Sequence, residues 1–190
     1  SSAASDVYKR QSSSKEVIMM RRLRKKYKTP RRPFERDRLI EEIKLTGYYG
    51  LRNKRELWRA KTLLSEIRRR ARRLLAIPPE ERVSEEKALI DKLYKLGVLE
   101  KDATLDDVLR LKVEDILERR LQSVVWRLGL AESPHQARQM VVHRHIMVNG
   151  RIVTSPSYLV RRDDIVEIRQ RCPFAKLMVE RKTEEEITEE

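Results

Sequence analysis

Residues 117–168, LERRLQSVVWRLGLAESPHQARQMVVHRHIMVNGRIVTSPSYLVRRDDIVEI, decide the fold of this chain, because they hold signals for helices and for a β-hairpin in one short segment. Apolar residues recur at helical spacing from Val113 to Leu128, and Gly129 follows them. This pattern predicts a single helix over residues 113–128, since a glycine commonly ends a helix. The other side of that helix is expected to face solvent and carries Arg119, Arg120, Gln122 and Arg127.

A second helix and a small sheet are expected after Gly129. Ser133 precedes Pro134, and this pair indicates a helix start, because a serine oxygen accepts a free backbone amide and proline loses no hydrogen bond at the first helical position. We expect this helix to reach about His143. Residues 146–153 place Asn149-Gly150 between two apolar runs, which is the strongest short-range signal for a β-hairpin. Residues 164–168 are expected to add a third strand.

The preceding region, residues 34–112, has the periodicity of helices. Four helices are expected there, over residues 35–45, 54–74, 84–96 and 105–109. Asn53, Ser84 and Thr104 are expected to cap three of them, with capping boxes at Asn53 and Thr104, where an acidic residue stands three positions later. The sequence therefore predicts an α+β fold, in which a mostly helical N-terminal region precedes a small module of two helices and a short antiparallel sheet.

The net charge points to a polyanionic partner. The formal charge of the chain is +14, and residues 1–82 alone contain 25 Lys and Arg against 10 Asp and Glu. Such a cationic segment favours a large polyanion, because neutralising phosphates releases counterions. Nucleic acid is favoured over a membrane surface, since the sequence has no long apolar segment and no lipidation signal.

Metal, cofactor and enzyme chemistry find little support in the residues. Cys172 is the single cysteine, so neither an intrachain disulfide nor a Cys-x-x-Cys zinc site is expected. His143 and His145 would point in widely different directions on a helix and are not expected to share a metal. The sequence shows no glycine-rich phosphate loop, nucleophile elbow or His-Glu-x-x-His pair. We therefore expect no catalytic residues, no metal and no cofactor.

Residues 113–179 resemble the S4 RNA-binding domain, which the ribosomal protein S4 family shares with pseudouridine synthases, tyrosyl-tRNA synthetases and a heat-shock protein. The resemblance is carried by Glu118-Arg119-Arg120-Leu121, Ser133, Gln136-Ala137-Arg138-Gln139, Val142, His143, Val148-Asn149-Gly150, Pro156-Ser157 and Asp164-Ile165-Val166. Upstream residues resemble the N-terminal half of that ribosomal family in its archaeal and eukaryotic form, through Arg31-Arg32-Pro33-Phe34 and Tyr49-Gly50-Leu51-Arg52-Asn53-Lys54-Arg55-Glu56-Leu57-Trp58. The resemblance covers about residues 20–179.

The resemblance implies a structural constituent of the small ribosomal subunit that is not an enzyme. It implies binding to small-subunit ribosomal RNA (rRNA) where several helices join, nucleation of assembly, other small-subunit ribosomal proteins as neighbours, and a position near the path by which messenger RNA (mRNA) enters. A cytoplasmic location is expected, since no secretory apolar segment precedes the basic region. Two alternatives remain open. One is a free-standing RNA chaperone or stress factor, which would need only the module; the less favoured one is a fragment of an RNA-modifying enzyme.

Candidate RNA-binding residues are cations and polar side chains on surfaces that we expect to face solvent. In the run from Arg68 to Arg73, repulsion between like charges costs about 0.2–0.5 kcal/mol per pair, so a bound polyanion explains the run better than a solvated surface does. Gln136, Gln139 and His143 share one helix face, where amide groups can contact 2′-hydroxyls. The complete set is Arg31, Arg32, Arg52, Asn53, Lys54, Arg55, Arg68, Arg69, Arg72, Arg73, Arg119, Arg120, Ser133, Gln136, Arg138, Gln139, His143, Arg144, His145, Asn149 and Arg151.

The chain ends are assigned from composition. Residues 1–19 are serine-rich and match nothing in the family, so we expect them to be disordered or extraneous. Residues 20–33 are expected to form a basic extended arm, because Pro30 and Pro33 oppose helix and the cations repel one another. We expect this arm to order only on RNA. Residues 180–190 form an acidic tail, which is expected to be solvated.

Overall fold

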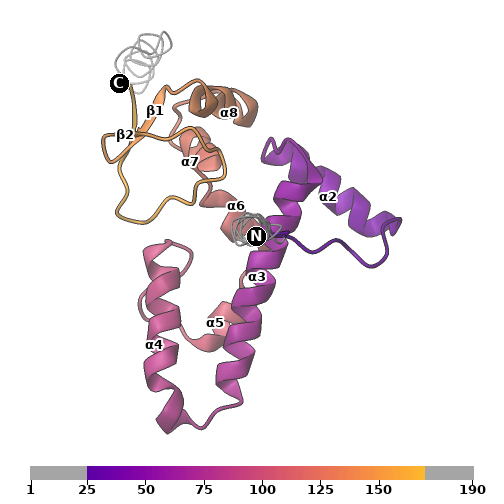
Figure 1. Cartoon of the computed structure of the whole chain (residues 1–190), viewed down its shortest axis with the longest axis vertical. Coiled ribbons are helices and arrows are strands. Elements are labelled where there is room, and N and C mark those ends of the chain that lie inside the picture. Colours follow the sequence, from indigo (N-terminus) through magenta and orange to yellow (C-terminus); the bar gives the residue numbers. More distant parts are fainter. Residues whose placement is uncertain (1–24, 170–190) are drawn as a thin grey trace, which may run out of the picture.

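The computed structural model describes residues 25–169, and the expectations for residues 1–19, 20–24 and 170–190 lie outside this range. Helices and a small antiparallel sheet make up the described range, so the predicted α+β class is confirmed (Figure 1). The elements are α2 Arg36–Tyr48, α3 Lys54–Leu75, α4 Pro79–Lys95, α5 Leu105–Arg110, α6 Val113–Glu118, α7 Leu121–Arg127, α8 Pro134–Val142, β1 Ile146–Val148, β2 Arg151–Ile152 and β3 Val166–Ile168. The long helix α3 runs through the centre, with α4 beside its C-terminal half (Figure 1).

Helix α3 organises the N-terminal core. Asn53 caps it as predicted, since its side-chain oxygen accepts a hydrogen bond from the Glu56 amide at 3.2 Å. Thr104 and Asp107 form the predicted capping box at the start of α5. The apolar residues of α3 recur every three or four positions and therefore line one side of the helix. That side packs in a core whose large members are Tyr49, Leu51, Leu57, Leu64, Leu74, Leu89, Leu93, Leu105, Leu111, Ile116 and Leu117.

The module has a separate core between α7, α8 and the sheet. Ser133 caps α8 as predicted, through a 3.2 Å hydrogen bond from the Gln136 amide. The helix ends at Val142, and Arg144 then takes a left-handed φ of 65° before β1 begins. This core is filled by Leu121, Val125, Ala131, Ala137, Met140, Val141, Ile146, Val148 and Val160.

The sheet has the strand order β2-β1-β3, and both pairs are antiparallel. Asn149 and Gly150 have φ values of 50° and 74°, which a tight two-residue hairpin turn requires, so the predicted hairpin is confirmed. The Asn149 side chain also accepts a hydrogen bond from the Ile165 amide at 2.9 Å and donates to Asp164 at 2.8 Å. The turn residue therefore fixes the chain just before β3.

The single helix predicted over residues 113–128 is wrong, because the chain breaks between α6 and α7. Arg120 has extended backbone angles and forms an antiparallel β-bridge with Leu159. The amide of Leu121 donates to the Tyr158 carbonyl at 2.8 Å, and the amide of Val160 donates to the Arg119 carbonyl at 2.9 Å. Hydrogen bonds from a segment forty residues later in the chain thus replace those of a continuous helix.

Two expectations about the N-terminal helices also need correction. Helix α4 starts at Pro79 and not at Ser84, because Pro79 occupies the first turn, where a missing amide costs nothing. In α2, Ile40 and Ile43, whose spacing indicated the helix, are exposed, and Glu42 is fully buried instead. Glu42 pairs with Lys61 and accepts from the Trp58 indole, both in α3, so the side of α2 that carries Glu42 faces α3.

The described part of the basic arm packs against α2 and α3. The Lys28 amide donates to the Thr62 hydroxyl at 3.0 Å, and Arg38 donates to the carbonyls of Arg32 and Pro33, each at 2.8 Å. The expectation that the arm orders only on RNA is therefore wrong for residues 28–33. These backbone hydrogen bonds leave the arm's cationic side chains free to contact a partner.

We expect Gly50→Ala to destabilise the protein more than Gly129→Ala. Gly50 has a φ of +57°, and a Cβ at this position would lie 2.8 Å from the Cβ of Pro134, whereas Gly129, at a φ of +70°, has nothing within 4 Å. Both substitutions carry the left-handed penalty of about 1–2 kcal/mol, and only the first adds a clash. Urea denaturation measures the two losses. Equal losses would argue against close packing of the end of α2 on α8.

Candidate nucleic-acid interface

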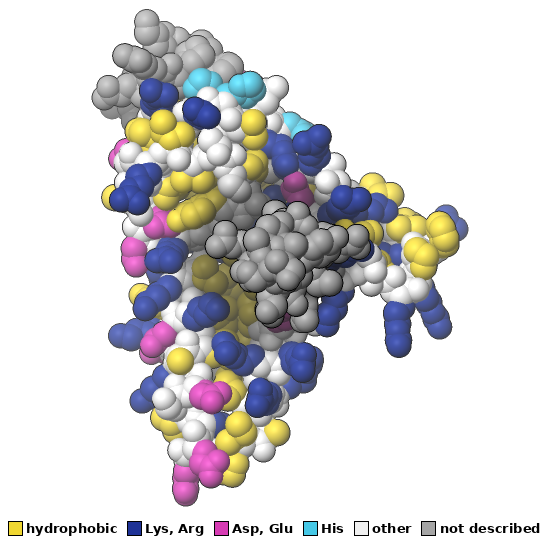
Figure 2. Space-filling model, in the orientation of Figure 1, with side chains coloured by type: hydrophobic (Ala, Val, Ile, Leu, Met, Phe, Trp, Pro, Cys, Tyr) yellow, Lys and Arg dark blue, Asp and Glu magenta, His cyan; other side chains and the backbone are white. Residues whose placement is uncertain are grey.

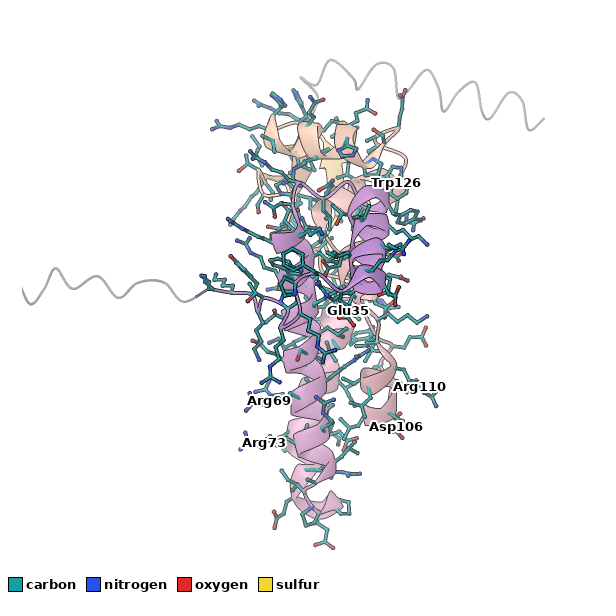
Figure 3. The ribbon with its side chains drawn as sticks, turned by 90° about the vertical axis from the view of Figure 1, so that its right-hand side faces the viewer. Glu35, Arg69, Arg73, Asp106, Arg110 and Trp126 are labelled. Atoms are coloured by element: carbon teal, nitrogen blue, oxygen red, sulfur yellow. The ribbon has the colours of Figure 1, made fainter. Side chains whose placement is uncertain are left out.

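The solvent side of α3 carries three of the predicted RNA-binding arginines. Arg69, Arg72 and Arg73 are exposed, and together we call them the arginine stripe. Arg72 and Arg73 follow Arg69 by three and four positions, so the helix places all three on one side. Arg69 and Arg73 extend from one side of α3, and Arg110 of α5 extends from the opposite side of the molecule (Figure 3). One RNA backbone that runs along α3 can therefore contact the guanidinium groups of Arg69, Arg72 and Arg73.

Arg68 does not belong to the stripe, although it was predicted to face solvent beside Arg69. Its guanidinium donates to the carbonyl oxygen of Leu111, and the side chain is only partly exposed. Leu111 lies in the short connection between α5 and α6. The expectation of a free guanidinium is therefore wrong, because Arg68 stands at the edge of the buried side of α3 and holds this connection.

A hollow of about 520 Å³ lies along α8, and we call it the α8 hollow. It contains the predicted polar face, since it is lined by Ser133, His135, Gln136, Arg138, Gln139, Val142 and His143. At its edge, the ring of His143 stacks on that of His145, with centroids 6.3 Å apart. Histidine side chains gather at this end of the molecule (Figure 2). Amide and imidazole groups both donate and accept hydrogen bonds, which suits contact with sugar hydroxyls and phosphates.

Ser133 and Gln136, at the start of the α8 hollow, have partners within the same turn of the chain. The Ser133 hydroxyl accepts from the Gln136 amide, and the Gln136 side-chain oxygen accepts from the Glu132 amide at 2.8 Å. Gln139 and His143 are exposed, and Arg144 next to them is exposed as well. The side chains best placed for an RNA partner in this hollow are therefore those near the end of α8.

A partly buried ion-pair cluster joins the helical region to the module. Glu56 of α3 lies 2.7 Å from the Arg120 guanidinium and 2.7 Å from the Arg138 guanidinium. Burial alone would raise the pKa of Glu56, but the hydrogen bond from Arg138 and the charge of Arg120 outweigh it, so the pKa of this carboxyl lies below its ordinary value. Glu56 is thus ionised at neutral pH, and it does not complete the capping box predicted for α3.

Gln122 completes this cluster through its side-chain amide. The two hydrogens of its Nε2 serve three carbonyl oxygens, those of Tyr49, Gly50 and Pro134 at 3.2, 2.9 and 2.9 Å, so one hydrogen is shared between two acceptors. Its Oε1 accepts from Arg138 at 3.1 Å. Gln122 is fully buried, although the helical pattern placed it on the solvent side. We call Glu56, Arg120, Gln122 and Arg138 the junction.

The junction gives a structural role to two candidate RNA-binding residues, Arg120 and Arg138. Arg120 is 5% exposed, so the expectation that it faces solvent is wrong. The break before α7 turns its side chain toward Glu56 instead of outward. Arg138 is partly exposed and borders the α8 hollow while binding Glu56. Both guanidiniums are held by a carboxylate, and their first role is to connect the two halves of the chain.

The remaining candidates in the arm and at the start of α3 differ in exposure. Arg31 and Arg32 are exposed in the arm, and Arg52 and Arg55 are exposed beside the first turn of α3. Lys54 is partly exposed, and the Asn53 side chain is used as the helix cap. The exposed arginines bring positive charge to the N-terminal end of α3.

In the module, the last three candidate RNA-binding residues also differ in exposure and in hydrogen-bond partners. Arg151 is exposed in β2, whereas the Asn149 side chain is engaged with Asp164 and Ile165. Arg119 is partly buried, and its Nη2 donates to the Val160 carbonyl at 3.2 Å. Of these three, only Arg151 is left with its charged group on an open surface.

A second group of cations, which the sequence pattern did not indicate, lies where α4 meets the loop before β3. Lys92, Lys95 and Arg161 help to line a hollow of about 540 Å³. The Arg162 amide donates to the Lys95 carbonyl at 3.0 Å, and its guanidinium lies 4.8 Å from the centre of the Tyr94 ring. The lysines of α4 and the arginines of the loop are more than sixty residues apart in the chain, so no local signal could have grouped them.

Charged side chains are distributed unevenly over the surface. On the face shown in Figure 2, Lys and Arg follow α3 and α2, and acidic side chains gather at the lower tip, where α4 begins.

Among residues 25–169, no group of three or more His, Cys, Asp and Glu is arranged to hold a metal ion. No helix in that range combines the length and apolar character needed to cross a bilayer.

The two halves of the chain match two family models. Residues 119–166 match the S4 domain, and residues 21–118 match the ribosomal protein S4/S9 N-terminal domain. The models meet at the break between α6 and α7. The fold and surface thus define an RNA-binding S4-domain protein with a helical N-terminal domain of the ribosomal type.

Relatives extend the match over most of the chain. Small ribosomal subunit protein uS4 of Ignicoccus hospitalis is 59% identical over 76% of this chain and 87% of its own length. The uS4 proteins of Hyperthermus butylicus and Sulfurisphaera tokodaii are 51% and 52% identical, over 86% and 80% of this chain and 94% and 87% of their own lengths. The chain therefore belongs to the ribosomal protein S4 family, as its sequence motifs predicted.

Proposed function

We propose that this chain is a structural constituent of the small ribosomal subunit that binds small-subunit rRNA and catalyses no reaction. The identity of the relatives as small-subunit proteins supports the subunit assignment, and the exposed cations support the RNA partner. The junction is the structural feature that supports this proposal most strongly. Because it ties α3 to α8 and to the start of α7 through partly buried hydrogen bonds, the arginine stripe and the α8 hollow are held at a fixed angle.

A fixed angle between two RNA-binding surfaces favours recognition of shape. The arginine stripe supplies phosphate contacts, which bind strongly but carry no sequence information. The α8 hollow supplies hydrogen-bonding groups suited to sugars and phosphates. A protein with both surfaces in one rigid body binds best where RNA helices meet at a matching angle. By holding such RNA helices together at the point where they meet, early in assembly, the protein would nucleate assembly of the subunit.

Other partners are part of the same proposal. We infer that neighbouring small-subunit ribosomal proteins contact the surfaces that rRNA leaves open, and that the chain lies near the path by which mRNA enters. A free-standing RNA chaperone would need the module alone. The junction argues against that alternative, because it commits Arg120, Arg138 and Gln122 of the module to the helical region.

The subunit assignment can be tested in cells that express a tagged copy of the full chain. After centrifugation through a sucrose gradient, the tag should sediment with small subunits and remain there after a moderate salt wash. Recovery of the tag only in the ribosome-free fractions would refute the assignment.

The role of the α8 hollow can be tested by substitution. We expect Gln139→Ala combined with His143→Ala to weaken rRNA binding while changing stability by no more than about 0.5 kcal/mol, because both side chains are exposed. Leu121→Ala, at a fully buried position, should cost about 2–5 kcal/mol of stability. Filter binding and urea denaturation measure the two effects. Equal stability losses in both variants would show that the exposed residues are structural.

A further inference from the structure

A third hollow, of about 230 Å³, lies between the arm, α2 and α3, away from the α8 hollow. We call it the arm hollow. It is lined by Lys28, Thr29, Pro30, Arg38, Glu42, Trp58, Lys61, Thr62 and Ser65. Three of these residues are cations, one is a carboxylate, and Trp58 supplies a flat apolar wall. The arm closes one side of this hollow, since Lys28 is held by its amide on Thr62.

Glu42 is fully buried, and its two oxygens are used unequally. Oε1 accepts hydrogen bonds from Arg38 at 2.8 Å, from Lys61 at 3.1 Å and from the Trp58 indole at 3.2 Å. Oε2 is buried and has no hydrogen-bond partner among the residues that the structure describes. A buried acceptor without a partner costs free energy, so a donor that reaches Oε2 would be bound favourably.

The charge state of Glu42 restricts that ligand to a donor. Burial alone would raise its pKa, but hydrogen bonds from Lys61, Arg38 and Trp58 outweigh it, so the pKa lies below the ordinary value. An ionised carboxylate only accepts. The last torsion of a glutamate is soft, and a small rotation about it can bring Oε2 toward a group in the hollow.

The arm hollow lies on the same side of α3 as the arginine stripe. Trp58, Lys61 and Ser65 follow one another at three- and four-residue spacing, and Arg69 comes four residues after Ser65. The rise of an α-helix places Ser65 and Arg69 about 6 Å apart along the axis. An RNA strand that runs along the stripe would therefore pass the mouth of the hollow.

We propose that the arm hollow takes one unpaired RNA base that carries an exocyclic amino group, which donates to Oε2 of Glu42 beside the Trp58 ring. This inference rests on the proposed RNA-binding function and adds a specificity to it. Lys28, Lys61 and Arg38 surround the hollow with positive charge suited to the attached phosphates. Cytosine and uracil have the same ring size, but cytosine presents an amino donor where uracil presents a carbonyl acceptor.

Oligocytidine and oligouridine of equal length are therefore the matched probes, used with the full chain. The chain has two tryptophans, so a Trp126→Phe background makes fluorescence report on Trp58. We expect oligocytidine to bind about tenfold more tightly than oligouridine, which corresponds to 1.4 kcal/mol, and to change Trp58 fluorescence. Glu42→Gln replaces the free oxygen by a donor, so the preference should disappear or reverse.

Two further variants keep the test decisive if Glu42→Gln does not fold. Ser65→Leu puts bulk at the mouth of the hollow without removing a charge, and it should abolish the preference for cytidine. Arg110→Ala, on the opposite side of the molecule, should leave the preference for oligocytidine over oligouridine unchanged (Figure 3). Equal affinity for the two probes with unchanged Trp58 fluorescence, in a chain that still binds small-subunit rRNA, would overturn the inference and leave the proposed function standing. Failure to bind rRNA as well would overturn both.

Discussion

Replacing Glu56 with alanine is expected to lower the free energy of unfolding by about 3–5 kcal/mol. The Arg120 side chain is only 7% exposed, and Glu56 is the carboxylate that balances its charge at 2.7 Å. Without Glu56, Arg120 would be left as a buried cation, and Arg138 would lose its ion pair as well. The loss should therefore be much larger than that for an ordinary surface ion pair, which is about 0–1 kcal/mol.

Glu66→Ala is the matched control, because Glu66 is an exposed carboxylate on the same helix. It should change stability by no more than about 0.5 kcal/mol. Urea denaturation followed by circular dichroism measures both variants. If Glu56→Ala were no more harmful than Glu66→Ala, the junction would not be what holds the helical region to the module.

The acid sensitivity of the protein should change with the same substitution. Because the pKa of Glu56 is lower in the folded chain than its ordinary value of 4.5, its contribution to stability is complete above that value. The contribution is lost as the pH falls from about 4.5 through the lowered pKa. The difference in stability between the wild type and Glu56→Ala should shrink over this range. A difference that stays constant down to low pH would contradict the lowered pKa.

Local signals in the sequence predicted several parts of this fold correctly, because the interactions involved are local. Asn53 and Ser133 each bond to an amide three residues later. Asn149-Gly150 forms its turn with the two positive φ angles that these residues tolerate. In each of these cases, the residues that make the structure are neighbours in the chain, so their spacing alone was informative.

The break between α6 and α7 could not be predicted in this way. Residues 113–128 keep helical spacing throughout, and no proline or glycine interrupts them. The break arises because Leu121 and Val160 exchange hydrogen bonds with partners about forty residues away in the chain. Such distant contacts leave no mark on the periodicity of either segment.

The same reason explains the errors in the candidate site. Arg120 and Arg69 are both arginines on the polar side of a helical pattern, so the local pattern predicts the same exposure for both. In the structure one is buried against Glu56 and the other is exposed. Likewise, Glu42 stands among apolar residues of α2 in the sequence, and in the structure it is fully buried and accepts hydrogen bonds from Arg38, Lys61 and the Trp58 indole. Only the partner carboxylate or cation, which is remote in the chain, distinguishes such residues.

Neutralising the arginine stripe, with Arg69, Arg72 and Arg73 all changed to glutamine, should weaken rRNA binding and make it less dependent on salt. Each phosphate contact contributes about 0.7–0.9 to the slope of log affinity against log salt concentration. If each arginine neutralises one phosphate, the slope should become shallower by about 2–3. Arg68 is left in place, because its hydrogen bond to Leu111 gives it a structural role. Circular dichroism should change little, since the three side chains are exposed.

The control for this experiment removes the same charge from another surface. Lys87, Lys101 and Arg110 are also exposed, and none of them belongs to the stripe. Changing these three residues to glutamine lowers the net charge equally, so any general effect of charge on RNA affinity appears in both variants. A steep salt slope that survives in the stripe variant, or an equal reduction in the control, would mean that rRNA does not follow α3. If the slope falls only in the stripe variant, the phosphates lie along the side of α3 that faces away from its core, and the junction then determines where the module meets the RNA.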